Sequence, residues 1–158
     1  MKSKITPCLW FDGRAEEAAK FYVSVFRDAK MGEVTRYGEA GPGPKGSVMT
    51  ASFTIEGQEF VGLNGGPNFK FNEAVSFQVQ CETQAEVDHF WEKLTAGGQE
   101  VACGWVKDKF GLSWQIVPSG LKDLMASPDT KKAEAATTAM LGMKKLDLAE
   151  IQRAADRA

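Results

Sequence analysis

Two segments, 74–81 and 112–118, alternate apolar residues with neutral polar ones. The polar members are Ser76, Gln78, Ser113 and Gln115. Because side chains alternate across a β-strand, these residues are expected to share one face of a sheet. Amides and hydroxyls can orient a small molecule, whereas a catalytic or metal-binding strand would carry a carboxylate or a histidine. By itself the pattern fits the solvated face of an antiparallel sheet, and a face that lines a small-molecule site is the open alternative.

Histidine and cysteine are sparse and poorly placed for nucleophilic catalysis. His89 is the only histidine, so a Ser–His–Asp or Cys–His arrangement would have to use it. It falls opposite, or at the edge of, the apolar stripe of the helix expected between Thr83 and Gly97, which favours a surface histidine. The cysteines are Cys8, Cys81 and Cys103. Their odd number and wide spacing predict neither a disulfide framework nor a zinc knuckle, and catalytic residues stay unassigned.

The glycines of the segment 38–46 match the pattern GxGxxG, but their context differs from that of a nucleotide-binding loop. Such a loop opens a helix, whereas the segment 47–55 that follows here has the pattern of a strand. Pro42 and Pro44 also remove two backbone N–H donors that a phosphate or ribose would need. We interpret the segment as a mobile loop bordering a cavity, and we expect no dinucleotide, S-adenosylmethionine or other cofactor.

Composition and charge limit the expected partners. A chain of 158 residues, 43% hydrophobic and 25% charged, is typical of a globular protein with a sizeable core. The net charge of −2 and the lack of a basic stripe argue against nucleic acid as a partner. The first residues lack the apolar core of a signal peptide and no apolar run has the length of a membrane span. We therefore expect a cytoplasmic protein without membrane contact.

Hydrophobic periodicity predicts elements whose order occurs twice. In the first half a strand leads through Asp12, the expected helix N-cap, into a helix and three strands. They cover residues 5–11, 14–28, 33–37, 47–55 and 58–64. In the second half a strand, a helix opened by a capping box at Thr83 and Glu86, and two further strands follow. These strands cover residues 74–81, 100–106 and 112–118. The predicted fold class is α+β, with two β-α-β-β-β modules at about 1–65 and 74–118.

The chain beyond Leu121 has helical character, interrupted at 127–129. We divide it into the paired modules, residues 1–126, and a C-terminal helical extension, residues 127–158. The extension is too apolar for a free tail, so we expect it to pack on the body or on a dimer partner. Its apolar residues include Met140, Leu141, Leu146, Leu148 and Ile151.

Three segments resemble the PhnB-like proteins of the vicinal oxygen chelate superfamily, often described as demethylubiquinone methyltransferase-like. They are ITPCLWFDGRAEEAAKFYVSVF at 5–26, GWVKDKFGLSWQIVPS at 104–119 and AMLGMKKLDLAEIQRA at 139–154. The superfamily includes glyoxalases, extradiol dioxygenases and fosfomycin- and bleomycin-resistance proteins. The resemblance implies two βαβββ modules that curl a mixed sheet around a cavity, with helices on the outer face.

The resemblance also implies where a metal would bind. Metal-binding members carry His, Glu or Gln on the first and last strand of each module. In this chain those positions fall near Pro7, Asn64, Ser76 and Gln115. Proline cannot ligate through its side chain, and Ser and Asn are poor ligands for zinc, iron or manganese. We therefore expect no metal site.

Given the resemblance, the polar strand face becomes a predicted ligand-lining face. Asn64 would complete the polar set, and Trp105 would lie beside a turn at the mouth of the cavity. Asp108 is more typical of a turn residue than of an acid or base. The predicted ligand-binding residues are Asn64, Ser76, Gln78, Trp105, Asp108 and Gln115.

Three functions stay open at this point. We favour a metal-free protein that binds an unknown small, partly apolar molecule. The alternatives are a vicinal oxygen chelate enzyme of lyase, isomerase or dioxygenase type with a divalent metal, and a methyltransferase, as the family description implies. We also expect a homodimer, because a curled sheet leaves edge strands and because two-fold symmetry is the commonest way to cover such edges. The resemblance implies the same.

Overall fold

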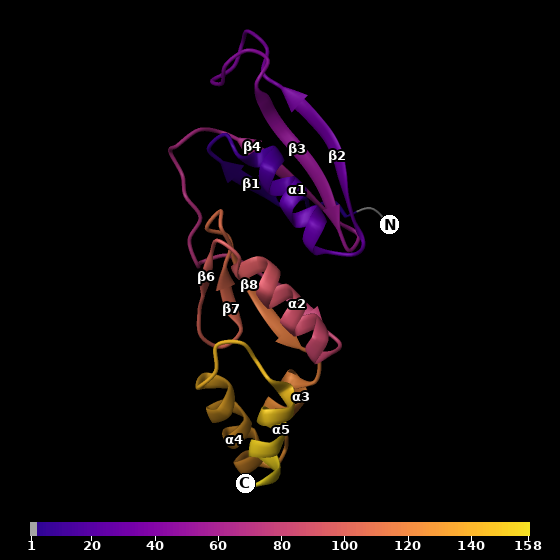
Figure 1. Ribbon diagram of the computed structural model, residues 1–158, viewed down its shortest axis with the longest axis vertical. Helices are drawn as coiled ribbons and strands as arrows, with labels where there is room; N and C mark the ends of the chain where they lie inside the picture. Colours follow the sequence, from indigo (N-terminus) through magenta and orange to yellow (C-terminus); the bar gives the residue numbers. More distant parts are fainter. Residues whose placement is uncertain (1–2) are drawn as a thin grey trace. The chain divides into compact units, whose positions relative to one another are not determined.

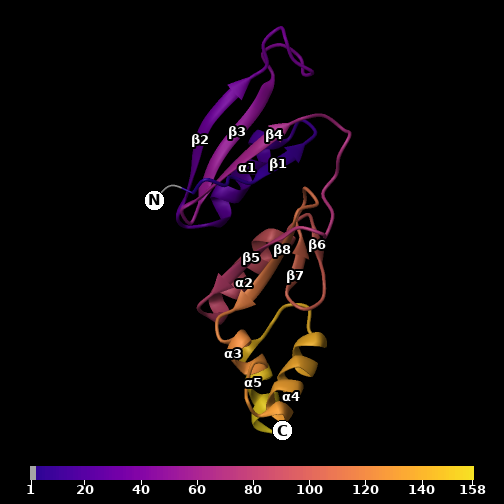
Figure 2. The ribbon, with the colours of Figure 1, turned by 180° about the vertical axis from the view of Figure 1, so that it is seen from behind.

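The computed structural model describes residues 3–158 and divides the chain into two compact units. The first unit ends at Phe71, and the second runs from Asn72 to Ala158. Each unit holds a four-stranded mixed sheet with one helix against it, and three more helices follow in the second unit (Figures 1 and 2). The chain is therefore an α+β protein with two modules of the same element order, which confirms the predicted fold class.

The first module orders its strands β1-β4-β3-β2, with β1 parallel to β4 and the other neighbours antiparallel. Its elements are β1 (Cys8–Phe11), α1 (Ala15–Val25), β2 (Ala29–Arg36), β3 (Val48–Ile55) and β4 (Gln58–Asn64). The buried Tyr22 of α1 packs on Phe53 of β3, with ring centroids 5.7 Å apart. Ala18 and Ala19 are also fully buried, and such small side chains let the helix lie close to the sheet.

Helix α1 begins without the side-chain cap that the sequence predicts. Asp12 is exposed, and the N-cap position belongs to Arg14, whose side chain makes no capping hydrogen bond. Instead, the N–H of Ala15 donates to Oδ1 of Asn64, at the end of β4, over 2.9 Å. The prediction of Asp12 as N-cap is wrong because a neighbouring strand supplies the acceptor that the helix terminus needs.

The second module repeats the arrangement with the strand order β5-β8-β7-β6, and its parallel pair is again the first and the last strand. Its elements are β5 (Ser76–Cys81), α2 (Gln84–Thr95), β6 (Gln99–Glu100), β7 (Trp105–Lys107) and β8 (Ser113–Pro118). Val87, Trp91 and Leu94 of α2 are buried, as their helical spacing predicts. They cover one face of the sheet, on which Val106 and Ile116 are also buried.

The segment 100–106, predicted as one strand, is a hairpin of two short strands, β6 and β7. The chain reverses between them through Cys103 and Gly104, whose φ angles are 59° and 82°. Such positive values turn the backbone out of the extended conformation. The single-strand prediction is wrong because a non-glycine residue opens this turn, so the sequence does not have the usual two-residue glycine signal.

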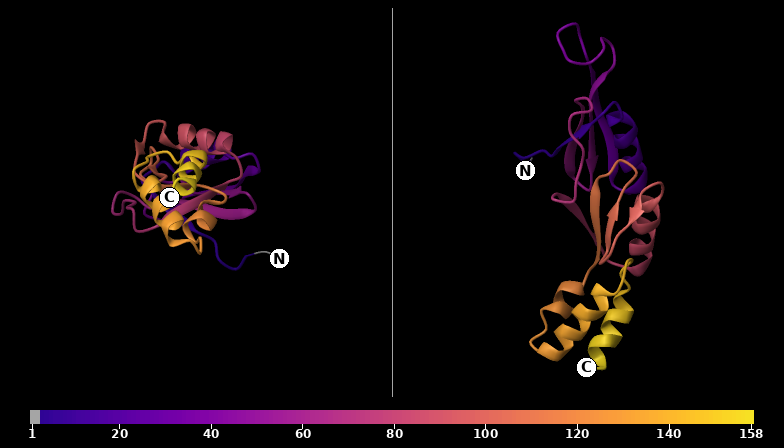
Figure 3. Two further views of the ribbon diagram at one scale, coloured as in Figure 1. Left: turned by 90° about the horizontal axis from the view of Figure 1, so that it is seen from below. Right: turned by 90° about the vertical axis from the view of Figure 1, so that its left-hand side faces the viewer.

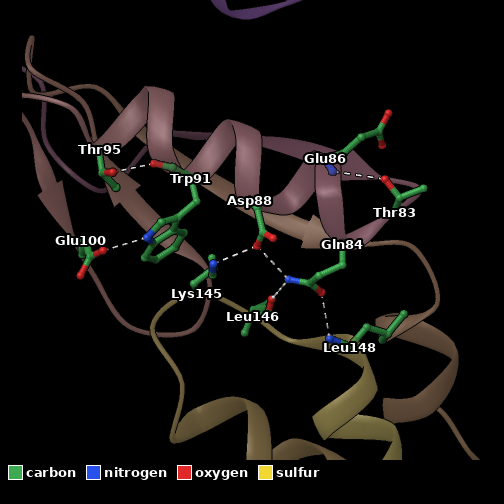
Figure 4. Close-up of polar contacts among 10 residues, drawn as sticks. All are labelled: Thr83, Gln84, Glu86, Asp88, Trp91, Thr95, Glu100, Lys145, Leu146 and Leu148. Atoms are coloured by element: carbon green, nitrogen blue, oxygen red, sulfur yellow. Dashed lines mark hydrogen bonds and ion pairs between the residues drawn. The ribbon is translucent and has the colours of Figure 1, made fainter.

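The capping box predicted for α2 is present. The hydroxyl of Thr83 accepts a hydrogen bond from the N–H of Glu86 over 3.2 Å (Figure 4). The Glu86 carboxylate reaches back to the N–H of Glu82, one residue before the N-cap, over 2.6 Å. The Thr83 bond provides a partner for an N–H group in the first turn of the helix, where no earlier carbonyl can receive it, and the Glu86 bond fixes the residue that precedes the N-cap.

Three helices follow β8 and pack on one another (Figure 3): α3 (Leu121–Met125), α4 (Thr130–Leu141) and α5 (Leu148–Asp156). Because α3 packs with the other two, the C-terminal extension is defined from here on as residues 121–158, which adds α3 to the predicted 127–158. It belongs to the second unit. Its buried core includes Leu121, Leu146 and Ile151, and the half-buried Val117 of β8 packs against that core. Leu146 and Ile151, two of the apolar residues expected to pack on the body or on a dimer partner, are thus covered within the chain. Leu141, by contrast, is 60% exposed. Over residues 3–158, no helix combines the length and the apolar character needed to cross a membrane.

Candidate functional site

A cavity of about 560 Å³ lies in the second unit, between its sheet and the C-terminal extension. The sheet side is formed by residues that point away from α2, because Trp105, Gln115 and Gln78 are consecutive partners across β7, β8 and β5. The neighbouring row, which includes Val106 and Trp114, is buried on the other face. The lining residues are Gln78, Gln80, Cys103, Trp105, Gln115, Val117, Pro118, Gly120, Leu121, Lys122, Met125, Ala126, Met140 and Leu146.

A chain of hydrogen bonds joins the polar residues of the sheet face. The amide nitrogen of Gln115 donates to the hydroxyl of Ser76 over 2.9 Å, and the amide nitrogen of Gln78 donates to the amide oxygen of Gln115 over 3.3 Å. This network orients the Gln115 amide, while the exposed Gln78 stays accessible from the cavity. A positioned amide of this kind can both donate to and accept from a bound molecule.

Of the predicted ligand-binding residues, the structure brings Ser76, Gln78, Trp105 and Gln115 together. Ser113, which the same alternation places beside them, is buried and does not line the cavity. The sequence reasoning missed the wall formed by α3 and the chain after it. It also left out Gln80, although this residue continues the alternation of Ser76 and Gln78, so a signal for it was present.

Asp108 lies outside the cavity lining and is 3% exposed. One carboxylate oxygen accepts the N–H groups of Phe110 and Leu112 over 2.8 Å and 3.1 Å, and the other accepts the indole N–H of Trp114 over 2.9 Å. These bonds hold the turn before β8 and fix a large core ring. The geometry gives Asp108 the turn role that its position in the sequence favours, and a contact of Asp108 with a ligand stays a prediction.

Asn64 lies in the first unit, where its side chain has structural partners. In addition to accepting from Ala15, it donates through Nδ2 to the carbonyl of Val48 over 3.1 Å. It lines a separate cavity of about 410 Å³ in that unit. Both functional groups of its amide thus help to position β4, β3 and α1, and a role in ligand binding stays a prediction.

Two of the three glycines that match GxGxxG, Gly41 and Gly43, pack against the ring of Tyr37. A Cβ added at Gly43 or Gly41 would lie 2.3 Å or 2.8 Å from the Tyr37 ring, so the loop requires glycine to close over it. The Tyr37 hydroxyl donates to the carbonyl of Asn64 over 2.6 Å. The loop then leads into β3, not into a helix. It does not have the strand–loop–helix geometry in which backbone N–H groups hold a phosphate.

The side chains on the sheet face do not fit a transition metal. The cavity lining offers the neutral oxygens of Gln78, Gln80 and Gln115 and a single thiol, that of Cys103. Zinc and iron sites are built from imidazole, thiolate and carboxylate ligands. Among residues 3–158, no group of three or more His, Cys, Asp or Glu residues has a metal-binding arrangement. We therefore derive no chemistry through a metal.

Hydrogen bonds and an ion pair join α2 to the extension, which forms one wall of the cavity (Figure 4). The Gln84 amide donates to the carbonyl of Leu146 over 3.0 Å and accepts from the N–H of Leu148 over 3.4 Å. Lys145 forms an ion pair with Asp88 over 2.8 Å. The hydrogen bond from Lys145, and a further one from Gln84, lower the pKa of the Asp88 carboxyl below its usual value. The segment that carries Leu146 into the cavity is thereby held by side chains of α2.

The hairpin β6–β7 provides a second attachment of the extension. The N–H groups of Cys103 and Gly104 donate to the carbonyls of Met143 and Lys144, both over 2.8 Å. A Cβ at Gly104 would lie 2.8 Å from the carbonyl oxygen of Ile116 and 2.9 Å from a methyl group of Leu146. The turn at Cys103 and Gly104 therefore places two backbone donors against the extension beside the cavity.

Two modules of this topology define the fold class of the protein, a paired β-α-β-β-β fold that it shares with fosfomycin resistance proteins. Within that class, the chain belongs to the family described as 3-demethylubiquinone-9 3-methyltransferase, whose model matches residues 3–117. The predicted resemblance to PhnB-like proteins is thereby confirmed. The segment 139–154, which contributed to that resemblance, lies beyond the matched residues. No curated protein matches the chain.

Solved structures agree with this assignment. The PhnB protein of Bacillus cereus is 40% identical, with a TM-score of 0.68, and the match covers 74% of this chain and 100% of that one. Protein PA1353 of Pseudomonas aeruginosa is 19% identical, with a TM-score of 0.61, over 73% of this chain and 97% of that one. The fosfomycin resistance protein FosX of Mesorhizobium loti is 12% identical, with a TM-score of 0.55, over 80% and 99%. The last two show the fold alone.

Proposed function

We propose that the protein binds a small, partly apolar molecule in the cavity of its second module and that it does so without a metal. The observation that carries the proposal is the pair of hydrogen-bonded amides Gln115 and Gln78 on the wall of a cavity of about 560 Å³, with Gln115 held from behind by the hydroxyl of Ser76. A few oriented polar groups in a largely apolar cavity of this size are typical of small-molecule sites. Trp105 offers a ring for stacking, and Leu121 and Met125 offer apolar contacts from the opposite wall.

Native mass spectrometry of the purified protein tests this proposal first, because a ligand that co-purifies adds its mass to that of the chain. Gln115→Leu should release the ligand, since it removes the central amide of the network at nearly constant volume. Trp105→Ala should release it by removing the aromatic surface. His89→Ala is the control, because His89 is exposed on α2 and does not line the cavity. An added mass that persists in both cavity variants would contradict the site.

Two alternative functions predict different results in further measurements. A metal-dependent enzyme of the superfamily would retain near-stoichiometric metal after purification without chelators, and chelator would lower its melting temperature by removing a ligand of the native state. A methyltransferase, as the family description implies, would bind S-adenosylmethionine saturably in a calorimetric titration. The neutral ligand set and the packing of the glycine loop on Tyr37 lead us to expect neither result.

We also propose that the chain forms a homodimer. Each sheet has two outer strands, β1 and β2 in the first unit and β5 and β6 in the second, and each of these has one neighbour within its own sheet. An unpaired strand edge invites pairing with another chain. The exposed Leu141 adds apolar surface, although Leu146 and Ile151 do not. Light scattering at micromolar concentration should give twice the chain mass of 17.2 kDa. A mass equal to that of one chain would refute the dimer.

A further inference from the structure

The C-terminal extension determines the charge of the cavity that binds the proposed ligand. The family match ends at residue 117, before α3 begins at Leu121. The wall formed by Leu121, Lys122, Met125, Met140 and Leu146 is therefore an addition of this chain to the part that the family model covers. Selectivity for a ligand should then depend on this wall as well as on the sheet.

Lys122 stands out in this wall. Among the lining residues of the described chain, it is the only charged one, and no Asp or Glu lies among them. None of the ion pairs found over residues 3–158 involves it. The opposite wall presents the neutral amides of Gln78, Gln80 and Gln115, whose NH₂ groups can donate to an anion but cannot neutralise one. Lys122 is therefore the one group that gives this cavity a net charge.

The apolar surroundings strengthen the effect of that charge on a bound molecule. Leu121 is buried and Val117 is half-buried, so a ligand seated between them would exclude water from part of the site. A cationic ligand would find no counter-charge there. A ligand with an apolar body and an anionic group would pair with the ammonium group of Lys122 and receive hydrogen bonds from the amides.

We infer that the ligand is an anionic, partly apolar small molecule and that Lys122 of the extension is the residue that selects for its negative charge. This inference rests on the proposed function, because it requires the cavity to bind a small molecule. A carboxylate and a phosphate monoester share the recognising chemistry, a charged oxygen group that accepts from an ammonium. Both are therefore possible sources of the anion.

A matched pair of probes tests the inference: 2-naphthoate and 2-naphthamide have the same body and differ in charge. Side-chain NMR signals of Gln78, Gln115 and Trp105 report whether a probe enters the cavity. We expect the wild type to bind naphthoate about fivefold more tightly than naphthamide, in the range of an exposed ion pair, because Lys122 is exposed. Lys122→Gln should abolish this preference and leave naphthamide binding unchanged. Lys131→Gln, an exposed change of the same charge on α4, should have no effect.

The outcomes separate the two proposals. Equal affinities of the two probes, with shifts in the cavity signals, would overturn the selection by Lys122 and support the proposed binding site. A naphthoate preference that survives in Lys122→Gln, or shifts confined to other residues, would overturn it as well. Failure of both probes to perturb the cavity signals would count against the binding site itself. Where naphthoate is preferred, the affinity for 2-naphthyl phosphate is measured as well. Of the carboxylate and the phosphate, the site is built for the one whose affinity falls more in Lys122→Gln.

Discussion

Replacement of Asp108 by asparagine tests how the second module holds its central turn. Asp108 is 3% exposed, and its two carboxylate oxygens accept two backbone N–H groups and the indole N–H of Trp114. Asparagine keeps one oxygen and places an NH₂ donor where the other stood, so at least one of these donors loses its acceptor. A buried unsatisfied donor costs about 1–3 kcal/mol, and the bonds that remain lose the added strength of a charged acceptor. We expect Asp108→Asn to lower the free energy of unfolding by roughly 2–4 kcal/mol.

Urea unfolding followed by tryptophan fluorescence measures this loss, and for a chain of this size it corresponds to a fall in melting temperature of roughly 4–16 °C. Asp123→Asn on α3 is the matched control, because Asp123 is exposed and the change removes the same charge. It should alter the free energy of unfolding by less than about 0.5 kcal/mol. If Asp108→Asn were as stable as the wild type but no longer bound the co-purified ligand, Asp108 would be a ligand group and the structural role would be refuted.

Three further tests, the first with its own control variant, address other parts of the structure. Gly104→Ala should lower the free energy of unfolding by about 2–4 kcal/mol, because its φ is 82° and its Cβ would meet a backbone oxygen of β8. Gly13→Ala, with a φ of 77° and nothing within 4 Å of the Cβ, should lose only about 1 kcal/mol under the same urea assay. Asp88→Asn should cost less than about 1 kcal/mol at pH 7, since its ion pair is half-exposed. Because the pKa of Asp88 is lowered in the folded state, the wild type is more stable to unfolding than Asp88→Asn at pH values above the usual carboxyl pKa. This difference in stability is lost as pH falls through the lowered pKa. Urea titrations at pH 7 and pH 3 should show this. Burial raises the pKa of the Cys81 thiol to about 12, so iodoacetamide at pH 8 should label the exposed Cys8 well before Cys81, as peptide mass mapping would show.

The elements with strong local signals were predictable from the sequence. The capping box at Thr83 and the apolar spacing of α2 both depend on residues within one helix, and both are confirmed. The hairpin at Cys103 and Gly104 was missed, because its cause lies elsewhere in the chain. Gly104 is required by its contacts with β8 and with Leu146, and neither contact is visible in the local sequence. Local patterns thus give the order of the elements, while turns set by distant contacts need the structure.

The candidate site divides in the same way. Strict alternation in two strands was enough to place Gln78 and Gln115 on one face, and the parallel pairing of β5 with β8 puts them in register. The opposite wall was not predictable, because Lys122 and Met125 reach the cavity through the packing of a short helix on later helices. Helical periodicity identifies the apolar side of such a segment but not the surface that it covers.

The two modules also show why equivalent strands have unequal roles. In the first module α1 has no side-chain cap of its own, and the amide of Asn64, at the end of β4, supplies the missing acceptor. In the second module α2 carries its own cap in Thr83, so no side chain of β8 is needed for that purpose. The residue of β8 that pairs with the end of β5, as Asn64 pairs with the end of β1, is Pro118, which has no polar side chain. The amide that β8 does carry, at Gln115, is oriented by Ser76 toward the cavity. The two modules therefore use their amides differently: the amide of Asn64 holds the start of α1, whereas the amide of Gln115 lines the cavity of the second module.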